Sequence, residues 1–379
     1  MEFQPSDEHM AFQRVVRDFA LREIAPKAQE WDEAGRLPVT LIHALGDLGL
    51  FALPFPEAWG GSDDFLSLCL AIEELGRVDQ SVGITVSAGV GLGATPIFRF
   101  GTDAQRARWL PDLLTGRALA AFGLTEPDAG SDAGATRTTA TRQDGQWVLN
   151  GAKAFITNSG TAITALITVT AKTVENQISS FVIPAGTPGL TVAPAPRKLG
   201  WHASDTHDLS LVDLVLPDDA LLGAPGAGYK NFLSILDDGR IAIAALAVGC
   251  AQACLDHAVD YAKARSAFGG PIGRFQAIAF ALADLSVAVE NARNLTYKAA
   301  WCKETGRPFR QEAARAKLYS TEAAVSATRV ATQVFGGSGF MEETAVARLY
   351  RDAKILEIGE GTSEIQRLVI ARGLGLPVQ

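Results

Sequence analysis

Hydrophobic periodicity divides the chain into a helical part, a strand-rich part and a second helical part. In the first third, apolar side chains recur every three or four residues, as on the buried face of a helix. This pattern predicts helices over Asp7–Trp31, Val39–Leu48, Phe65–Leu75, Ser81–Phe98 and Asp103–Thr115. From Tyr229 onward the same spacing returns in stretches of roughly two dozen residues, a length typical of helix bundles.

The middle third consists of short runs rich in β-branched residues. Thr138–Arg142 and Gln146–Asn150 flank Gln143-Asp144-Gly145, which is a typical hairpin turn. Further strands are expected over Ile163–Thr170, Ser179–Ile183, Leu190–Val192 and Asp208–Val212, with loops at Pro194–Pro196 and Leu216–Gly228. The pattern predicts an α+β protein with an N-terminal helical domain (1–118), a central antiparallel β-domain (119–226) and a C-terminal four-helix bundle (227–379).

Composition is that of a globular protein with a large core, because 47% of the 379 residues are hydrophobic and 20% are charged. The net charge of −8 and the absence of a dense Lys/Arg run give no reason to expect nucleic-acid binding. Residues 81–98 carry no charge, but their glycines and Pro96 favour a buried helix over a membrane span. No membrane insertion is therefore expected.

The N-terminus and the cysteines indicate the cellular compartment. The first residues lack the basic start and apolar run of a secretion signal, and their acidic side chains argue against a transit peptide. The four cysteines have no C-x-x-C spacing, which is typical of buried thiols in a reducing compartment. We expect a bacterial cytoplasmic protein, although a processed protein of an organellar matrix would look the same.

One carboxylate stands out as candidate chemistry. Glu360 lies between Gly359 and Gly361, directly before a helix that Thr362 or Ser363 can cap. The glycines permit positive φ and let a substrate approach closely. Taken alone, such a residue is more often a solvated carboxylate that complements the helix dipole.

Several ordered segments along the chain carry a resemblance to a known family. They are Leu124–Asp132, Leu149–Asn158, Lys198–Trp201, Asp237–Arg240, Arg265–Gly269, Phe335–Phe340, Arg348–Ile355 and Ile358–Arg367. Together they resemble the acyl-CoA dehydrogenases over essentially the whole chain, with a likeness to the short-chain, butyryl-type branch. The resemblance implies that Glu360 is the catalytic base. Some branched-chain members carry the base at the position of Gly239, and glycine cannot do that work.

A redox cofactor is required, because no side chain accepts a hydride. The resemblance implies FAD, and the chain has no strand-linked G-x-G-x-x-G fingerprint for a Rossmann-type site. The matching flavin positions are Phe122, Leu124, Thr125, Phe155, Ile156, Thr157, Thr362 and Glu364. Phe155 departs from the tryptophan of many relatives, which keeps an aromatic face and loses the indole donor. Without the neighbouring motif, Phe122, Leu124 and Thr125 would be ordinary strand residues.

A second group of positions matches contacts to the phosphates and adenosine of FAD, partly across a subunit boundary. These are Arg265, Phe268, Gln276, Gln333, Gly336 and Gly337. Arginine forks suit phosphate oxygens, and successive glycines expose amides to an anion. The alternative is that Arg265 is a cation at a helix C-terminus and that Gly336–Gly339 stops a helix.

The resemblance also implies positions that contact the substrate. Ser131, Asp237, Arg240 and the backbone of Gly361 match contacts to the acyl-CoA, while Asp238 fits a helix-dipole role better. Ser131 has the alternative of stabilising the turn around it. The acyl chain is expected beside Ile84, Thr85, Ala88 and Leu92, a stripe that is more often core than pocket. If it is pocket, the small Ala88 leaves room for chains longer than four carbons.

These features predict FAD-dependent α,β-dehydrogenation of a short- to medium-chain acyl-CoA to the trans-2-enoyl-CoA. The resemblance implies that electrons pass to an electron-transfer flavoprotein and that the working unit is a homotetramer. The enzymatic alternative is an acyl-CoA oxidase that uses oxygen. The alternative from another class is a non-catalytic thioester-binding relative, which the presence of Glu360 argues against.

Overall fold

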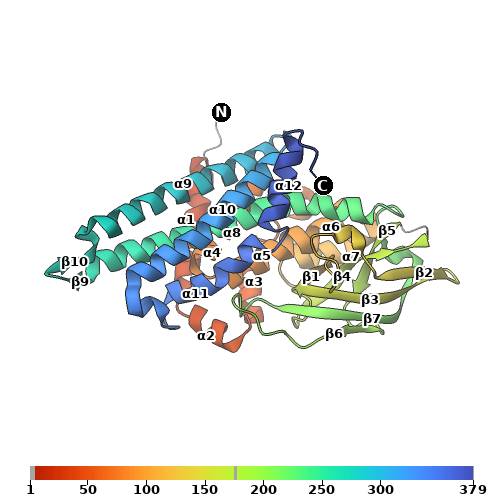
Figure 1. The fold of residues 1–379 in the computed structure, drawn as a ribbon. Helices are drawn as coiled ribbons and strands as arrows, with labels where there is room; N and C mark the ends of the chain where they lie inside the picture. Colours follow the sequence, from red (N-terminus) through yellow and green to blue (C-terminus); the bar gives the residue numbers. More distant parts are fainter. Residues whose placement is uncertain (1–4, 175–176, 379) are drawn as a thin grey trace.

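The N-terminal part of the computed structural model, which describes residues 5–174 and 177–378, is a set of packed helices (Figure 1). Side-chain caps at Ser6, Asp64, Asp79 and Thr102 accept from backbone amides and start four of them. The helices are α1 (Asp7–Phe19), α2 (Ala28–Ala34), α3 (Val39–Asp47), α4 (Phe65–Val78), α5 (Gln80–Ser87), α6 (Thr95–Phe100) and α7 (Asp103–Leu114).

Two of the predicted helices contain π-helical segments, so the prediction of uninterrupted helices was wrong there. The stretch Asp7–Trp31 breaks into α1, the π-helix Ala20–Ile24 and α2, because Pro26 has no N–H to donate to the preceding turn. The stretch Ser81–Phe98 lies within α5, the π-helix Ala88–Ala94 and α6. Pro96 again removes a donor, and the Thr95 hydroxyl bonds the Val90 carbonyl at 2.9 Å.

The central part is an eight-stranded sheet in the order β6-β7-β3-β2-β4-β5-β8, with β1 also paired to β4. Its pairings are antiparallel, as expected, except for β1–β4 and one β2–β4 residue pair, which are parallel. β1 and β4 are separated in the chain by β2 and β3 and are not joined by a tight turn, which allows them to pair in parallel. The strands are β1 (Leu119–Gly123), β2 (Thr139–Gln143), β3 (Gln146–Thr157), β4 (Thr164–Lys172), β5 (Ile178–Pro184), β6 (Leu190–Val192), β7 (Thr206–Pro217) and β8 (Leu221–Leu222).

Some strands differ from the expected lengths. β3 and β7 are twelve residues each, and they pair with register shifts at Leu149/Gly151 and Lys153/Ile156. The second shift is a bulge that turns Phe155 outward with φ of 60°. The expected loop Leu216–Gly228 instead contains the end of β7 and the short strand β8.

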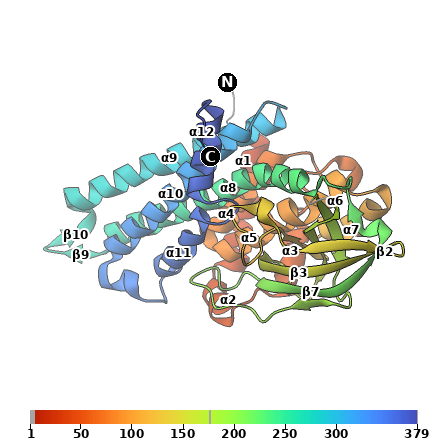
Figure 2. The ribbon, with the colours of Figure 1, turned by 45° about the vertical axis from the view of Figure 1, so that its right-hand side comes forward.

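The C-terminal part is a helix bundle made of α8 (Gly228–Ala264), α9 (Gln276–Glu304), α10 (Arg310–Phe335), α11 (Ala345–Ala353) and α12 (Ser363–Gly373). Helix α8 runs from the β-domain to the small hairpin of β9 (Ser266–Ala267) and β10 (Gly270–Pro271) (Figures 1 and 2). The bundle therefore has one end at the β-domain and a free end at this hairpin.

The core joins α4, α5 and the middle of α8. Gly76 and Gly83 face the Leu246 side chain, and a Cβ at Gly249 would overlap the Glu73 carbonyl, so these helices approach closely. The stretches Gln80–Phe100 and Gly228–Ala264 are long and apolar enough to span a membrane, but 78% of the apolar window in each is buried inside the protein. They are core helices here, as predicted for residues 81–98.

Candidate active site

The loop that carries Glu360 is held by two hydrogen bonds to the Gly361 carbonyl and by the side-chain cap of α12. The Thr362 hydroxyl accepts from the Ile365 amide at 3.3 Å and starts the helix. Glu360 has φ of 52° and Gly361 has φ of 97°, so the left-handed turn includes the carboxylate residue itself. The Gly361 carbonyl accepts from the Lys317 Nζ and from the Gln366 Nε2, each at 2.8 Å.

The Glu360 carboxyl group lies directly against Gly239 of α8. A Cβ at Gly239 would overlap the Glu360 Oε2, so the missing side chain makes the space that this carboxyl group occupies. Gly239 itself is buried. The chain thus has room for one carboxylate at this point, and Glu360 provides it.

Burial decides the electrostatics of Glu360. Its Oε2 is inaccessible and has no hydrogen-bond partner among the residues that the structure describes. Burial raises the pKa of Glu360 to about 7, against the opposing effects of the nearby Lys317 and Arg240 cations. A carboxyl group with a pKa near neutrality can accept a proton at physiological pH.

Arg240 of α8 lies near the Glu360 carboxyl group and pairs with Asp237 one turn earlier. The Arg240 guanidinium donates to Asp237, and the Arg310 Nε lies 3.8 Å from the same carboxylate. Within the described residues the buried Arg240 Nε has no hydrogen-bond partner. The neighbouring Asp238 instead binds Arg99 and Lys303, so it ties α8 to two other helices, which fits a structural role.

Some of the predicted flavin positions on the β-domain pack against α8. Phe122 is the last residue but one of β1 and stacks on Phe232 of α8 with centroids 4.0 Å apart, whereas Leu124 and Thr125 follow the strand rather than lying on it. The Ala154 amide donates to the Thr125 carbonyl at 2.9 Å. Phe155 is 69% exposed, so its ring is available to a planar ligand.

A buried ion pair fixes these two segments to each other. The Lys153 Nζ lies 2.7 Å from the Glu126 Oε1, and both side chains are almost fully buried. Glu126 also accepts from the amides of Arg137 and Thr138. Glu126 follows Thr125, and Lys153 lies two residues before Phe155, so the pair sets their relative position.

The other predicted cofactor residues lie at the free end of the bundle. Arg265 ends α8, Phe268 forms the tip of the β9–β10 hairpin with 90% exposure, and Gln276 starts α9. Gln333 in the last turn of α10, and Gly336 and Gly337 just after that helix, lie at the same end, since Phe335 stacks on Tyr261 with centroids 4.1 Å apart. Figures 1 and 2 both show this hairpin at the end opposite the β-domain. One chain therefore does not bring all predicted cofactor residues together.

The remaining predicted residues are divided between the site and the core. Thr362 and Glu364 adjoin Glu360, Ile156 is buried, Thr157 is half-buried, and Ser131 is exposed on a loop. Ile84, Thr85 and Ala88 are buried, while the half-buried Leu92 packs against the cluster of Phe122, Leu124 and Phe232. Their roles toward an acyl chain stay predictions.

Three residues of the site were missed by the sequence analysis. Lys317 occupies the buried face of α10, and Glu126 and Lys153 form the buried pair of the β-domain. For Lys317 a signal existed, because Ala313, Ala316 and Ser320 share its helical face and a lysine on such a face requires a partner.

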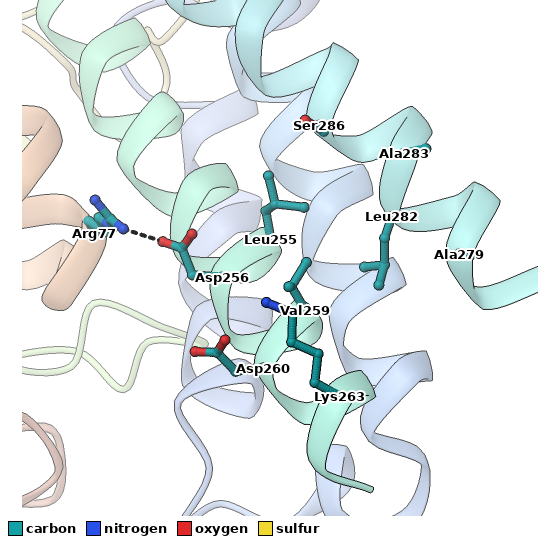
Figure 3. Close-up of a pocket in the computed structure, with 10 residues that line it drawn as sticks. All are labelled: Arg77, Leu255, Asp256, Val259, Asp260, Lys263, Ala279, Leu282, Ala283 and Ser286. Atoms are coloured by element: carbon teal, nitrogen blue, oxygen red, sulfur yellow. Dashed lines mark ion pairs between the residues drawn. The ribbon is translucent and has the colours of Figure 1, made fainter. Parts of the chain in front are cut away.

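A surface groove between α8 and α9 lies apart from these residues (Figure 3). It is lined by Leu255 and Leu282, with Asp260, Lys263 and the Arg77–Asp256 ion pair of 2.5 Å at its rim. None of the residues predicted for catalysis, cofactor or substrate lines it.

Comparison with known proteins assigns the family. The family models for the acyl-CoA dehydrogenase N-terminal, middle and C-terminal domains match residues 6–117, 121–214 and 226–375, respectively. The chain is 49% identical to the "Probable acyl-CoA dehydrogenase YngJ" of Bacillus subtilis, over 99% of this chain and 100% of that protein.

Two solved structures share the fold. The butyryl-CoA dehydrogenase of Megasphaera elsdenii has a TM-score of 0.94 and 42% identity, over 99% of this chain and 100% of that chain. A chain in the structure of the electron transferring flavoprotein of Acidaminococcus fermentans has a TM-score of 0.95 and 40% identity, over 99% of both chains. The protein belongs to the acyl-CoA dehydrogenase family and is an oxidoreductase.

Proposed function

We propose that this protein catalyses FAD-dependent α,β-dehydrogenation of short- to medium-chain acyl-CoA thioesters to trans-2-enoyl-CoA, with Glu360 as the base. The observation that carries this proposal is the Glu360 carboxyl group, whose inaccessible Oε2 fills the space at Gly239 and whose pKa is raised to about 7. An orphan carboxyl oxygen in such a place has no structural purpose that the surrounding residues reveal.

The residues present fit a flavin. Phe155 offers an exposed ring at a bulge, and Thr125 and Thr157 are half-buried on the two segments beside it. When bound, FAD supplies the acceptor for the hydride that leaves Cβ. The chain's own residues do the rest: Glu360 takes the proton from Cα, while Asp237, Arg240 and Ser131 hold the thioester arm.

The free end of the bundle supports a flavin site that is shared between subunits. Arg265, Phe268 and Gln276, with Gln333, Gly336 and Gly337, would serve the FAD of a neighbouring subunit in a homotetramer. Closed symmetry makes such sharing reciprocal. The position of the β9–β10 hairpin supports this assignment, because the hairpin lies at the opposite end of the molecule from the β-domain of its own chain (Figure 1).

We infer that electrons leave to an electron-transfer flavoprotein. The support is the likeness to a chain in a structure described by that name. We also propose a bacterial cytoplasmic location, since relatives occur in Bacillus subtilis and Megasphaera elsdenii. Peroxide formed during turnover at the rate of substrate loss would assign the oxidase reaction instead, and a screen of thioesters by chain length would define the substrate.

Glu360→Gln tests the base. The change keeps size and removes the proton acceptor, so flavin reduction by butyryl-CoA should fall by about 10²–10⁴-fold. FAD content and melting temperature should stay close to wild type. Glu357→Gln is the matched control, since Glu357 lies three residues away and pairs with Lys354. Flavin reduction within a few-fold of wild type in Glu360→Gln would place the base elsewhere.

A further inference from the structure

We propose that Lys317 is a positioning residue for the catalytic base: it fixes the Glu360 loop through the Gly361 carbonyl, and its cation favours the ionised form of Glu360. This inference rests on the proposed role of Glu360. It concerns a side chain of α10 that has no place in the contacts to substrate or cofactor described above.

Burying the Lys317 ammonium group has a large desolvation cost. The Lys317 side chain is completely inaccessible, on a helix face otherwise formed by Ala313, Ala316, Ser320 and Ala324. Removing an ammonium group from water costs several kcal/mol even after relaxation. A leucine or methionine would fill this space without that cost, so the charge requires a partner that uses it.

The hydrogen bond points to the loop. The Lys317 Nζ donates to the Gly361 carbonyl, which already accepts from the neutral amide of Gln366. Gln366 is buried and lies on α12, so the carbonyl would keep one donor without Lys317. The ammonium therefore adds charge at the residue next to Glu360, besides a second hydrogen bond.

The surrounding charges show where that cation acts. Among the described residues, Lys317 takes part in no ion pair, and the carboxylate that affects it most is Glu360, followed by Glu357 and Glu364. Glu360 is faced by Lys317 from α10 and by Arg240 from α8. Arg240 is bound to Asp237, which offsets part of its charge. Lys317 is thus the less compensated cation beside the base.

The sign of the effect follows directly. Burial raises the pKa of Glu360 to about 7, and the Lys317 cation lowers it from what burial alone would give. Burial also lowers the pKa of Lys317 to about 8, so the ammonium is charged where the base ionises. Removing the cation should raise the pKa of Glu360 and leave less ionised base at neutral pH.

The experiment separates charge from hydrogen bonding. Lys317→Met removes both the cation and its hydrogen bond, whereas Gln366→Met removes a neutral donor from the same carbonyl. The first readout is exchange of the α-protons of acetyl-CoA with D2O, followed by NMR across pH 5–9. Acetyl-CoA has no Cβ, so this exchange reports proton transfer without hydride loss. The second readout is the pH profile of flavin reduction by butyryl-CoA.

Lys317→Met should move the acid limb of both profiles to higher pH by about one unit or more. Gln366→Met should keep the wild-type midpoint, and Lys317→Arg should recover most of the shift. Lys317→Gln, which is polar and neutral, serves in place of Lys317→Met if that variant does not fold. An unshifted midpoint in the neutral variants, or an equal shift in Gln366→Met, would overturn the role of the charge.

Glu360→Gln in the same exchange assay keeps the two proposals apart. If Glu360→Gln abolishes exchange while the neutral Lys317 variants keep the wild-type midpoint, only the role of Lys317 fails. If Glu360→Gln exchanges at the wild-type rate, the assignment of the base fails first.

Discussion

The two ends of the helix bundle differ in how much of their surroundings one chain supplies. At the β-domain end, Glu360 is enclosed by Gly239, Arg240 and Lys317 from two different helices. At the free end, Phe268 is 90% exposed and the Gly336 region has open space around it. A carboxyl group needs a dry, preformed place to raise its pKa, whereas a phosphate-binding edge needs exposed donors and can be completed by a partner.

Under the proposed function, this difference would make the reaction depend on the interior of one chain and the cofactor on an assembly. Catalysis at the β-domain end should therefore be sensitive to the addition of a single atom beside Glu360. The free end should be sensitive to the neighbouring subunit. Three changes test this comparison, in decreasing order of expected effect.

Gly239→Ala tests whether the enclosed end tolerates one methyl group. The new Cβ would occupy the position of the Glu360 Oε2, and displacing a catalytic group by about 1 Å can cost about 10²-fold in rate. Stopped-flow reduction of the flavin by butyryl-CoA should show a loss of that size. Gly91→Ala is the control, because nothing lies near its added Cβ. Wild-type reduction by Gly239→Ala would show that the carboxyl group has other room.

Arg265→Ala tests the free end. A charge-assisted hydrogen bond to phosphate is worth about 1.5–3 kcal/mol, so the Kd for FAD should rise by about 10- to 100-fold. Binding should be measured by flavin fluorescence during reconstitution of the apoprotein. An unchanged Kd would remove Arg265 from the cofactor site.

Mixed assemblies decide which chain Arg265 serves. If each flavin site takes Glu360 from one chain and Arg265 from its partner, subunits of Glu360→Gln and Arg265→Ala complement each other. Random pairing of equal amounts then restores about a quarter of wild-type activity at limiting FAD, because sharing is reciprocal. Activity no greater than that of the separate variants would place both residues in the same chain's site.

Asp352→Asn asks whether a raised pKa alone marks the active site. Burial raises the pKa of Asp352 to about 7, although its Oδ1 accepts from the Trp201 amide at 2.6 Å. Because the folded pKa exceeds the unfolded one, this group stabilises the protein fully below about pH 4, and that contribution is lost as the pH rises through 7. Asp352 contributes at most about 1.4 kcal/mol per pH unit to the slope of the free energy of unfolding against pH.

Between pH 4 and pH 8, the melting temperature of Asp352→Asn should therefore fall less than that of the wild type. Flavin reduction should be unchanged. A lower melting temperature than wild type at pH 8 would mean that the ionised carboxylate stabilises the fold. Unchanged catalysis would show that what distinguishes Glu360 is its unpaired oxygen beside a vacant Cβ position.

Much of the architecture could be predicted because local patterns decide it. Helical periodicity, the Asp144-Gly145 turn and the glycines around Glu360 each follow from backbone preferences of a few residues. The contact between Glu360 and Gly239 could not be predicted from pattern, since it joins segments far apart in the sequence through a side chain that is absent. Lys317 was missed for a related reason: a buried charge is recognised by its partner, and the Gly361 carbonyl lies 44 residues away in sequence.

The π-helix Ala88–Ala94 has a consequence for how this protein can change over evolutionary time. A π turn holds one more residue than an α turn, and each residue of an α-helix rotates the following side chains by about 100°. Deleting one residue from this segment would let it relax into an α-helix, while α5 and α6 stay anchored in the core. Side chains such as Leu92 would then turn to a new direction beside β1. A single codon lost or gained could thus reshape this wall without rebuilding the fold around it.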